Sequence, residues 1–269
     1  MTQREDLHQS PSNRGYLAEG CGNSFIIFES IDDIEFIVTQ LHKFDVDSAL
    51  VLKCTLKNKH NTIYEMSVVE RDGTVSEFCG NGARAVAAYL IKIYGDKTSY
   101  CIGTSESIVP IGNCDNGYFV DLPFPDVNSM DPKFSNIDDS PFQLYGYTFY
   151  EAQAFEPHIV TFDKVTLEQL VEIGQRINAE RELFPFGMNI NVVSISDLHL
   201  LQNTTFERGV NRITKSCGSG SACAMAVATT LDLIQLPCTV STPGGQITIH
   251  PIENGVRLSG AASCCPITS

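Results

Sequence analysis

The chain of 269 residues contains no tryptophan, and its 18 lysines and arginines are far outnumbered by 32 aspartates and glutamates. The net charge of −14 argues against a nucleic acid partner, because phosphate binding requires a basic surface. No run of about 18 apolar residues is present, so no transmembrane helix is expected. We therefore expect neither a nucleic acid nor a membrane as a partner. The composition leaves the oligomeric state open, a homodimer included.

The sequence also lacks a signal peptide pattern and a regular spacing of cysteines. Residues 1–16 are polar and mixed in charge and lack the apolar core of a signal peptide, so we expect a short mobile extension and a cytoplasmic location. The ten cysteines form no CxxC pair and no cluster with histidines. This spacing predicts reduced cysteines with neither a disulfide scaffold nor a metal site, and it assigns no role to Cys264 and Cys265.

What is present is a cysteine on a glycine turn at the start of a helix. Cys79 is followed by Gly80 and Gly82, which let the backbone bend sharply, and then by the helix-forming run 85–90. Unpaired N–H groups and the positive end of the helix dipole gather at such a turn. The turn therefore favours a thiolate and can also bind an anion.

The same pattern returns 138 positions later at Cys217, which is followed by Gly218 and Gly220 and again by a small, apolar helical run. Strands, a helix and more strands precede each cysteine turn, so the two halves repeat one plan. We predict an α+β protein of two pseudo-symmetric domains, 1–124 and 125–257, with the ligand site between them. The proline-rich segment 123–141 is the expected crossing, and the tail 258–269 is a candidate to return to the first domain.

The expected elements follow the hydrophobic periodicity. Helices are predicted over 32–42, from Cys79 to Tyr94, over 167–177 and from Cys217 to about 234. Strands are predicted at 24–28, 49–55, 63–70, within 100–122, and at 143–155, 159–162, 189–195, 239–249 and 255–259.

Two thiols that face one cleft can do what one thiol cannot. A thiolate removes a proton from one face of a tetrahedral carbon while the opposite thiol delivers a proton to the other face, which inverts the configuration in either direction. The N–H groups of Gly80-Asn81 and Gly218-Ser219 can hold the carboxylate of the substrate. No lysine context for a Schiff base and no dinucleotide-type glycine pattern is present, so no cofactor is expected.

These motifs together resemble the diaminopimelate epimerase family, the cofactor-independent amino-acid epimerases with two cysteines. The resemblance runs from about Gly22 to Gly260. It rests on Gly22-Asn23-Ser24-Phe25, Asp72-Gly73-Thr74, Cys79-Gly80-Asn81-Gly82-Ala83-Arg84, Pro157-His158, Phe184-Pro185 with Asn189, Glu207-Arg208-Gly209, Cys217-Gly218-Ser219-Gly220 and Pro243-Gly244-Gly245.

The resemblance implies an isomerase in which each domain is a sheet wrapped around a central helix. By that resemblance Cys79 and Cys217 are the acid/base pair, and His158 and Glu207 tune the thiols. The implied substrate contacts are Asn23, Gly80, Asn81, Asn189, Glu207, Arg208, Gly218 and Ser219, with Arg208 as the partner of a distal carboxylate.

The chain departs from the family pattern at positions that bear on the substrate. Glu70 and Glu156 stand where the family normally carries asparagine, and Ser48 aligns loosely with a usual glutamine. Two carboxylates there would repel a distal carboxylate and favour a distal cation. The segment between Arg208 and Cys217 is one residue longer than usual, and its basic residues are candidates to neutralise the new acids.

Three alternatives follow. The first is conversion of L,L- to meso-diaminopimelate for lysine synthesis, which the retained Asn189, Glu207 and Arg208 favour. The second is racemisation of another amino acid, such as histidine, lysine or ornithine, which Glu70 and Glu156 favour. The third is an amino-acid-binding relative without chemistry, which would have no reason to keep both cysteines.

Overall fold

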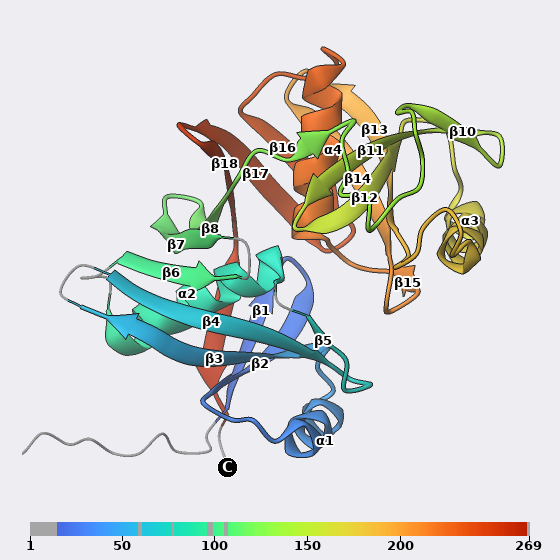
Figure 1. Cartoon of the computed structure of the whole chain (residues 1–269). Coiled ribbons are helices and arrows are strands. Elements are labelled where there is room, and N and C mark those ends of the chain that lie inside the picture. Colours follow the sequence, from blue (N-terminus) through green and yellow to red (C-terminus); the bar gives the residue numbers. More distant parts are fainter. Residues whose placement is uncertain (1–14, 59–60, 77, 96–98, 105–106, 268–269) are drawn as a thin grey trace, which may run out of the picture.

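The computed structural model describes residues 15–58, 61–76, 78–95, 99–104 and 107–267. Residues 1–14 of the expected extension lie outside this part, and Tyr16, its last residue, already begins a strand. Four helices occur among the described residues (Figure 1): α1 (Ile34–Phe44), α2 (Gly80–Tyr94), α3 (Leu167–Ala179) and α4 (Gly218–Thr230).

Nineteen strands accompany these helices in the described part of the chain. The first eight are β1 (Tyr16–Gly20), β2 (Asn23–Glu29), β3 (Ser48–Lys57), β4 (Asn61–Glu70), β5 (Val75–Ser76), β6 (Ser99–Gly103), β7 (Ile108–Cys114) and β8 (Gly117–Leu122). The others are β9 (Asp126–Val127), β10 (Phe142–Leu144), β11 (Tyr147–Ala154), β12 (Glu156–Thr161), β13 (Asn189–Asp197), β14 (Leu200–Glu207), β15 (Arg212–Ile213), β16 (Cys238–Thr242), β17 (Gly245–Ile252), β18 (Gly255–Gly260) and β19 (Ala262–Pro266).

The strand pairing repeats from one half to the other, which confirms the predicted duplicated α+β plan. In the first half β2 runs parallel to β3, β3 antiparallel to β4, and β4 parallel to β6. In the second half β12, β13, β14 and β16 are related in the same way. Because each parallel pair needs a crossover, α1 lies between β2 and β3, and α3 lies between β12 and β13.

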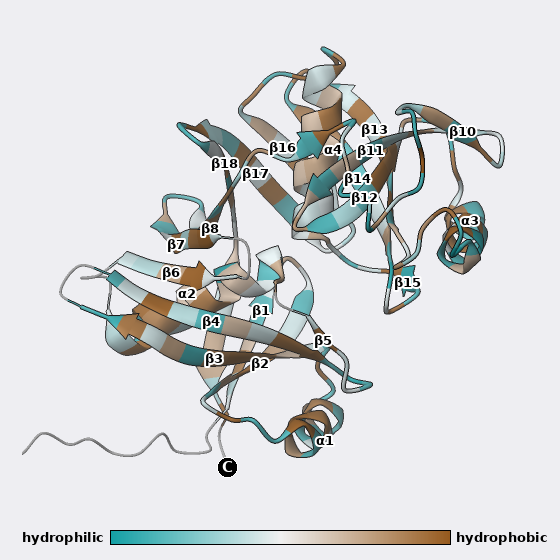
Figure 2. Cartoon of the chain, in the orientation of Figure 1, coloured by the Kyte–Doolittle hydropathy of each residue, from teal (hydrophilic) through white to brown (hydrophobic). Residues whose placement is uncertain are grey.

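Each half wraps its sheet around one buried helix (Figure 1). In the first half α2 packs against β1, β7, β8 and β19, and in the second α4 packs against β9, β11 and β12. Both helices are rich in alanine and glycine, so strands can approach them from all sides. The ribbon of α4 is mostly white to brown on the hydropathy scale (Figure 2). The outer helices α1 and α3 instead carry one buried face and are capped by Asp33 and Thr166.

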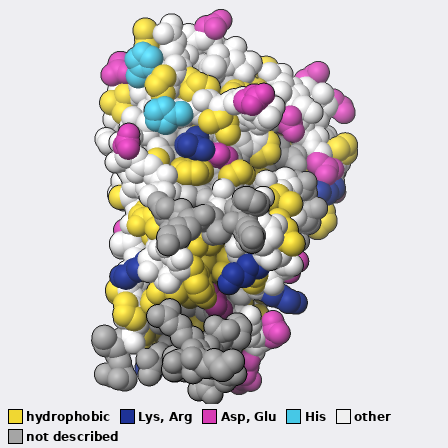
Figure 3. All heavy atoms as spheres, turned by 90° about the vertical axis from the view of Figure 1, so that its left-hand side faces the viewer, with side chains coloured by type: hydrophobic (Ala, Val, Ile, Leu, Met, Phe, Trp, Pro, Cys, Tyr) yellow, Lys and Arg dark blue, Asp and Glu magenta, His cyan; other side chains and the backbone are white. Residues whose placement is uncertain are grey.

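The last two strands of the chain, β18 and β19, join the second half to the first. Strand β18 pairs antiparallel with β8, and β19 then returns to pair with β1. Within the expected crossing segment 123–141, β9 already pairs with β11 of the second half. On the face shown in Figure 3 the carboxylates are spread out rather than gathered in one patch.

Several elements differ from the sequence-based expectation. Strands β1, β14 and β19 were not expected, and the predicted strand 143–155 is two strands, β10 and β11, joined by a turn at Tyr145 and Gly146. Helix α4 ends at Thr230 rather than near 234, because Leu231 is its cap and Asp232 has a left-handed backbone.

Candidate active site

A cleft of about 370 Å³ is lined by residues from both halves. Most of the predicted site residues line it: Asn23, Ser48, Glu70, Cys79, Gly80, Glu156, Asn189, Glu207, Arg208, Cys217, Gly218 and Ser219. Two predicted residues, Asn81 and His158, are fully buried and do not line the cleft. The structure therefore brings the two cysteine turns and the carboxyl groups of the sequence hypothesis to one place.

Each cysteine is the N-cap of its buried helix. The sulfur of Cys79 accepts a hydrogen bond from the N–H of Gly82 at 3.3 Å, and the sulfur of Cys217 accepts one from the N–H of Gly220 at 3.4 Å. Both cysteines have extended backbones, as N-cap residues do. The thiols thus lie at the positive ends of α2 and α4, where a thiolate and a substrate carboxylate are both favoured.

Glycine is required where the two helix starts meet. A Cβ on Gly218 would lie 3.1 Å from the Cα of Gly80, and a Cβ on Gly80 would lie 3.4 Å from the Cα of Gly218. Phe78 and Phe155 reinforce this contact with ring centroids 4.7 Å apart. The first turns of α2 and α4 therefore abut backbone to backbone, and Cys79 and Cys217 line the same cleft.

Strand register sets the first-half wall of the cleft. Phe25 on β2 is opposite Ser48 on β3, and Ser48 is opposite Glu70 on β4. Residues in register share one face of a sheet, as do residues two apart, so Asn23 lies on this face as well. The hydroxyl of Ser48 donates to a carboxylate oxygen of Glu70 at 3.0 Å.

The second half repeats this wall with different side chains. His158 on β12 is opposite Asn189 on β13, and Phe206 on β14 pairs with Ile190, which brings Glu207 opposite Asn189. The repeat makes Glu207 the counterpart of Glu70, because each ends the strand that pairs with a short hairpin strand before its cysteine. Phe25 and His158 occupy equivalent positions in the two walls, so Glu156, two residues before His158, is the counterpart of Asn23.

His158 lies behind the second cysteine turn. Its Nε2 is 3.0 Å from the hydroxyl of Ser219, which in turn is 3.5 Å from the sulfur of Cys217. Its Nδ1 is 3.1 Å from the amide nitrogen of Asn191. Burial, with a smaller effect of the Arg208 charge, lowers the pKa of His158 to about 3, so the imidazole is neutral at physiological pH.

The thiols are protonated at neutral pH. Burial raises the pKa of Cys79 to about 12, the N–H of Gly82 opposes this rise, and the charge of Glu207 adds to it. Burial and then Glu207 raise the pKa of Cys217 as well. A cation beside Glu207 would oppose its repulsion of both thiolates.

Glu207 is the carboxyl group whose charge acts on both thiols. Burial raises its pKa to about 7, and the hydroxyl of Thr214, which donates to it, acts in the opposite direction. Glu70 shows the same pattern more mildly, with its pKa raised by burial and lowered by the Ser48 hydroxyl. The charge of Arg212 also lowers the pKa of both carboxyl groups.

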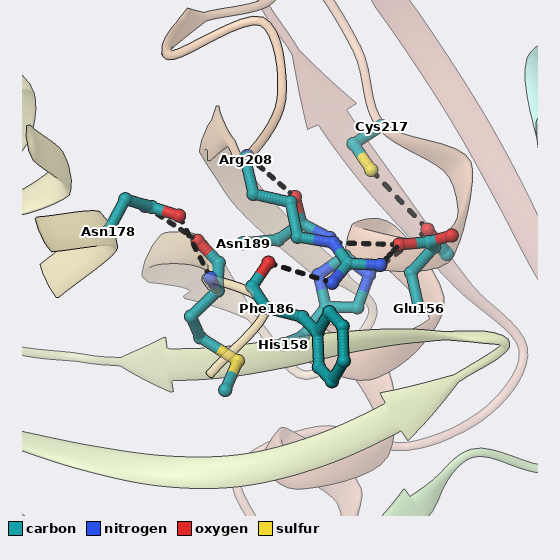
Figure 4. Close-up of polar contacts among 9 residues, drawn as sticks. Glu156, His158, Asn178, Phe186, Asn189, Arg208 and Cys217 are labelled. Atoms are coloured by element: carbon teal, nitrogen blue, oxygen red, sulfur yellow. Dashed lines mark hydrogen bonds and ion pairs between the residues drawn. The ribbon is translucent and has the colours of Figure 1, made fainter. Parts of the chain in front are cut away.

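Arg208 is already engaged in the cleft (Figure 4). Its Nε donates to a carboxylate oxygen of Glu156 at 2.9 Å, its Nη2 contacts the same oxygen, and its Nη1 donates to the carbonyl of Phe186 at 3.2 Å. Its backbone N–H donates to the side chain of Asn189 at 3.0 Å. The residue that the resemblance assigned to a distal carboxylate thus has an acid of the chain itself as its partner.

Asn81 connects the two cysteine turns from behind. Its side-chain nitrogen donates to the carbonyl of Ser216 at 3.1 Å, and its side-chain oxygen accepts from Arg84 at 2.8 Å. Its side chain is therefore structural, and any contact of this residue with a substrate must come from the backbone N–H.

Sequence reasoning missed several supporting residues. Asn191 orients His158, and it could have been found because it lies two positions after Asn189 and so shares its face. Thr214 and the carbonyl of Phe186 carried no sequence signal, since their roles depend on loop conformations. In the described part of the chain no group of histidine, cysteine and acidic side chains could hold a metal ion. In that part no helix has the length and apolar character needed to span a bilayer.

Comparisons with known proteins follow this geometry. The family described as diaminopimelate epimerase matches residues 155–263. Proteins named diaminopimelate epimerase are similar over nearly the whole chain. The one from Methanocella arvoryzae is 29% identical, covering 90% of this chain and 91% of its own, and the one from Natranaerobius thermophilus is 28% identical, covering 89% and 91%.

Solved structures share the fold at low identity. A predicted epimerase from Pseudomonas aeruginosa has a TM-score of 0.69 at 11% identity and covers 96% of this chain and 99% of its own. A hydroxyproline epimerase from Agrobacterium vitis, with bound trans-4-hydroxy-L-proline, has a TM-score of 0.65 at 12% identity and covers 95% and 91%. These likenesses confirm the expected fold class.

Proposed function

Because the chain is similar over nearly its whole length to proteins named diaminopimelate epimerase, we propose that it belongs to that family and is an isomerase that inverts the α-carbon of an amino acid with the two thiols Cys79 and Cys217. The observation that carries this proposal is the matched pair of thiols, Cys217 buried and Cys79 partly buried, each capping a helix and both lining one cleft.

In this proposal one cysteine, as a thiolate, removes the α-proton while the other thiol protonates the opposite face. The first turns of α2 and α4 hold the substrate carboxylate, and their N–H groups stabilise the negative charge that builds on it as the proton leaves. Glu207 receives the α-ammonium group. His158 acts on Cys217 only through Ser219, and as a neutral group it orients that hydroxyl without adding charge.

Diaminopimelate is the first candidate substrate, since the similar proteins from Methanocella and Natranaerobius carry that name. In this chain the reaction would convert the L,L isomer to the meso isomer and so serve lysine synthesis. A racemase for a basic amino acid is a second candidate, favoured by the pairing of Glu156 with Arg208. The cytoplasmic location and a homodimer remain predictions.

The test is replacement of each cleft cysteine. Cys79→Ala and Cys217→Ala should each retain the fold and lower inversion of L,L-diaminopimelate or L-lysine by about a thousandfold or more, since each removes one of two proton-transfer groups. Loss of the α-proton signal in D2O, followed by NMR, and chiral chromatography of the product measure exchange and inversion. Cys54→Ala, an exposed cysteine on β3, is the control. Inversion that persists in either cleft variant contradicts the mechanism, and wild-type binding without exchange supports a binding relative instead.

A further inference from the structure

Resting on the proposed function, we propose that the part of the cleft that receives the substrate side chain selects a cationic group, and that Glu156 sets this preference by occupying Arg208. Two sets of contacts carry the inference: those that engage Arg208 with Glu156, and those that leave Glu70 and Asn23 without a positively charged partner.

Arg208 is held on three sides. Its Nε and Nη2 both contact one carboxylate oxygen of Glu156, and its Nη1 donates to the carbonyl of Phe186. Its guanidinium carbon lies 5.4 Å from the ring centre of Phe134. The arginine is only 20% exposed and the glutamate 31%, so the pair is partly shielded from water. A substrate carboxylate at Arg208 would compete with Glu156, and displacing Glu156 would leave that carboxylate in the cleft without its cation.

The other cations of the cleft do not replace Arg208. Arg212 and Lys215 line the cleft but are exposed. Arg212 lies 3.7 Å from the carboxylate of Asp47, which competes for it. An exposed cation is screened by water and adds little to the binding of a carboxylate.

The acceptors on the first-half wall, unlike Arg208, have no oppositely charged partner among the described residues. Glu70 has a neutral partner, the hydroxyl of Ser48, and no ion pair joins it to a described cation. The side-chain oxygen of Asn23 is buried and has no hydrogen-bond partner among the described residues. Strand register places Asn23, Ser48 and Glu70 on one face at the cleft. A buried acceptor beside a carboxylate without a cation fits a positively charged donor.

Glu207 and Glu70, which occupy matched positions in the two halves, bind different groups of the substrate in this proposal. Glu207 acts on both thiols and precedes Glu70 among the charges that act on Cys79. The proposed function assigns the α-ammonium to Glu207. Glu70 remains for a second positive group farther along the substrate, such as the ammonium of a lysine or ornithine side chain.

Three substrates separate the effect of a distal amine on the exchange rate from the effect of a distal carboxylate. L,L-diaminopimelate and L-lysine share a distal amine and differ by the distal carboxylate, whereas L-norleucine lacks the amine of lysine. The rate of α-proton exchange in D2O, measured as kcat/KM by NMR, is compared for the three. In the wild type we expect lysine to exchange at least as fast as diaminopimelate, and norleucine to be slower by about a hundredfold, because Glu70 and Asn23 lose a charged partner.

Glu156→Asn should free Arg208 and raise the ratio of diaminopimelate to lysine by about tenfold or more, the size of one charge-assisted contact. Glu156→Gln keeps the shape of the side chain and should act in the same direction if the asparagine variant fails to fold. Glu172→Asn, which breaks an exposed ion pair on α3, is the matched control and should leave the ratio unchanged.

A wild type that exchanges diaminopimelate more than about tenfold faster than lysine, or norleucine as fast as lysine, overturns the inference while the proposed function stands. An unchanged ratio in both Glu156 variants does the same. If no amino acid exchanges, the proposed function fails. The inference is then tested by calorimetric binding, in which tighter binding of lysine than of norleucine and diaminopimelate supports it and any other order overturns it.

Discussion

The sulfur atoms of Cys79 and Cys217 each accept an N–H from the residue three positions on. This contact satisfies a helix N–H that would otherwise lack a partner, and it also lowers the thiol pKa against the effect of burial. Structure and chemistry therefore depend on the same atom. An alanine at either position removes the cap along with the proton donor, at a cost of about 0.5–2 kcal/mol in stability.

Glu207 gives a residue-scale prediction for the pH dependence of stability. Its folded-state pKa of about 7 lies above the value of about 4.3 for an unfolded chain, so the folded state binds more protons between these values. Titration of Glu207 therefore lowers stability as pH rises through this window, whereas His158, with its lowered pKa, acts in the opposite direction. Glu207→Gln cannot titrate, so the change in its free energy of unfolding from pH 5 to pH 8 should be more favourable than that of the wild type by about 2–3 kcal/mol.

Urea unfolding of both proteins at pH 5 and pH 8 measures this difference. The shifts of Glu70 and His158 are common to both proteins and cancel in the comparison. Glu172→Gln on the exposed face of α3 should leave the pH dependence as it is in the wild type. An equal change in the free energy of unfolding between pH 5 and pH 8 in wild type and Glu207→Gln would show that the pKa of Glu207 is not raised in the folded state.

At the scale of elements, the contact between the first turns of α2 and α4 sets the separation of the thiols. Gly218→Ala would place a Cβ 3.1 Å from the Cα of Gly80, and backbone atoms cannot rotate out of the way. We expect a loss of about 1–3 kcal/mol in the free energy of unfolding and a larger proportional loss of exchange rate, because proton transfer depends on the geometry of both thiols.

Gly103→Ala on β6 is the matched control, because its Cβ would make an ordinary contact of 3.5 Å with Ile63. Thermal unfolding and α-proton exchange are measured on both variants. An exchange rate in Gly218→Ala that falls no further than in Gly103→Ala would mean that the contact between helix starts does not control the site.

The four helices could be predicted because their apolar spacing, caps and cysteine turns are local signals. Strand β14 could not, and the reason lies in the site. Its inward residues Asn203 and Thr205 are polar and buried, because they hydrogen bond to Asn191, which orients His158. A buried polar network of this kind removes the alternation of apolar and polar residues by which a half-buried strand is recognised.

The site was predictable to the extent that its residues sit in short motifs. The motifs gave the cysteines and glycines, and the departures Glu70 and Glu156 were visible in the sequence. The pairing of Glu156 with Arg208 was not, because it joins residues 52 positions apart through the register of β12, β13 and β14. Charge partners across a sheet depend on strand order, which a single sequence does not specify.

At the scale of the whole molecule, the cleft depends on how the halves are held together. Strand β18 follows the second half in sequence and yet pairs with β8 of the first, and β19 continues to β1. The chain therefore crosses between the halves after β8 and again at β18. The domain limits at 124 and 257 remain a prediction, and these two crossings are the places where such limits would fall.

An ion pair fastens this second crossing. Arg257 on β18 donates from Nε and Nη2 to the two carboxylate oxygens of Asp121 on β8, at 2.7 and 2.8 Å, and its guanidinium carbon lies 3.7 Å from the ring centre of Phe119. The side chain of Asp121 is only 12% exposed. In a double-mutant cycle with Arg257→Met and Asp121→Asn we expect a coupling of about 1–2 kcal/mol in the free energy of unfolding, because the contact is bidentate and shielded.

The chain supplies the matched control in Arg71 and Asp45, a pair with a similar distance of 2.9 Å but with side chains 40% and 87% exposed. Its coupling should be about 0.5 kcal/mol or less, as for other pairs in water. Both cycles are measured by urea unfolding in low and high salt, and the Arg71 coupling should fall further with salt. Equal couplings in the two cycles would mean that the pair between β8 and β18 contributes no more than a surface contact, and that backbone pairing alone holds the halves in the arrangement that forms the cleft.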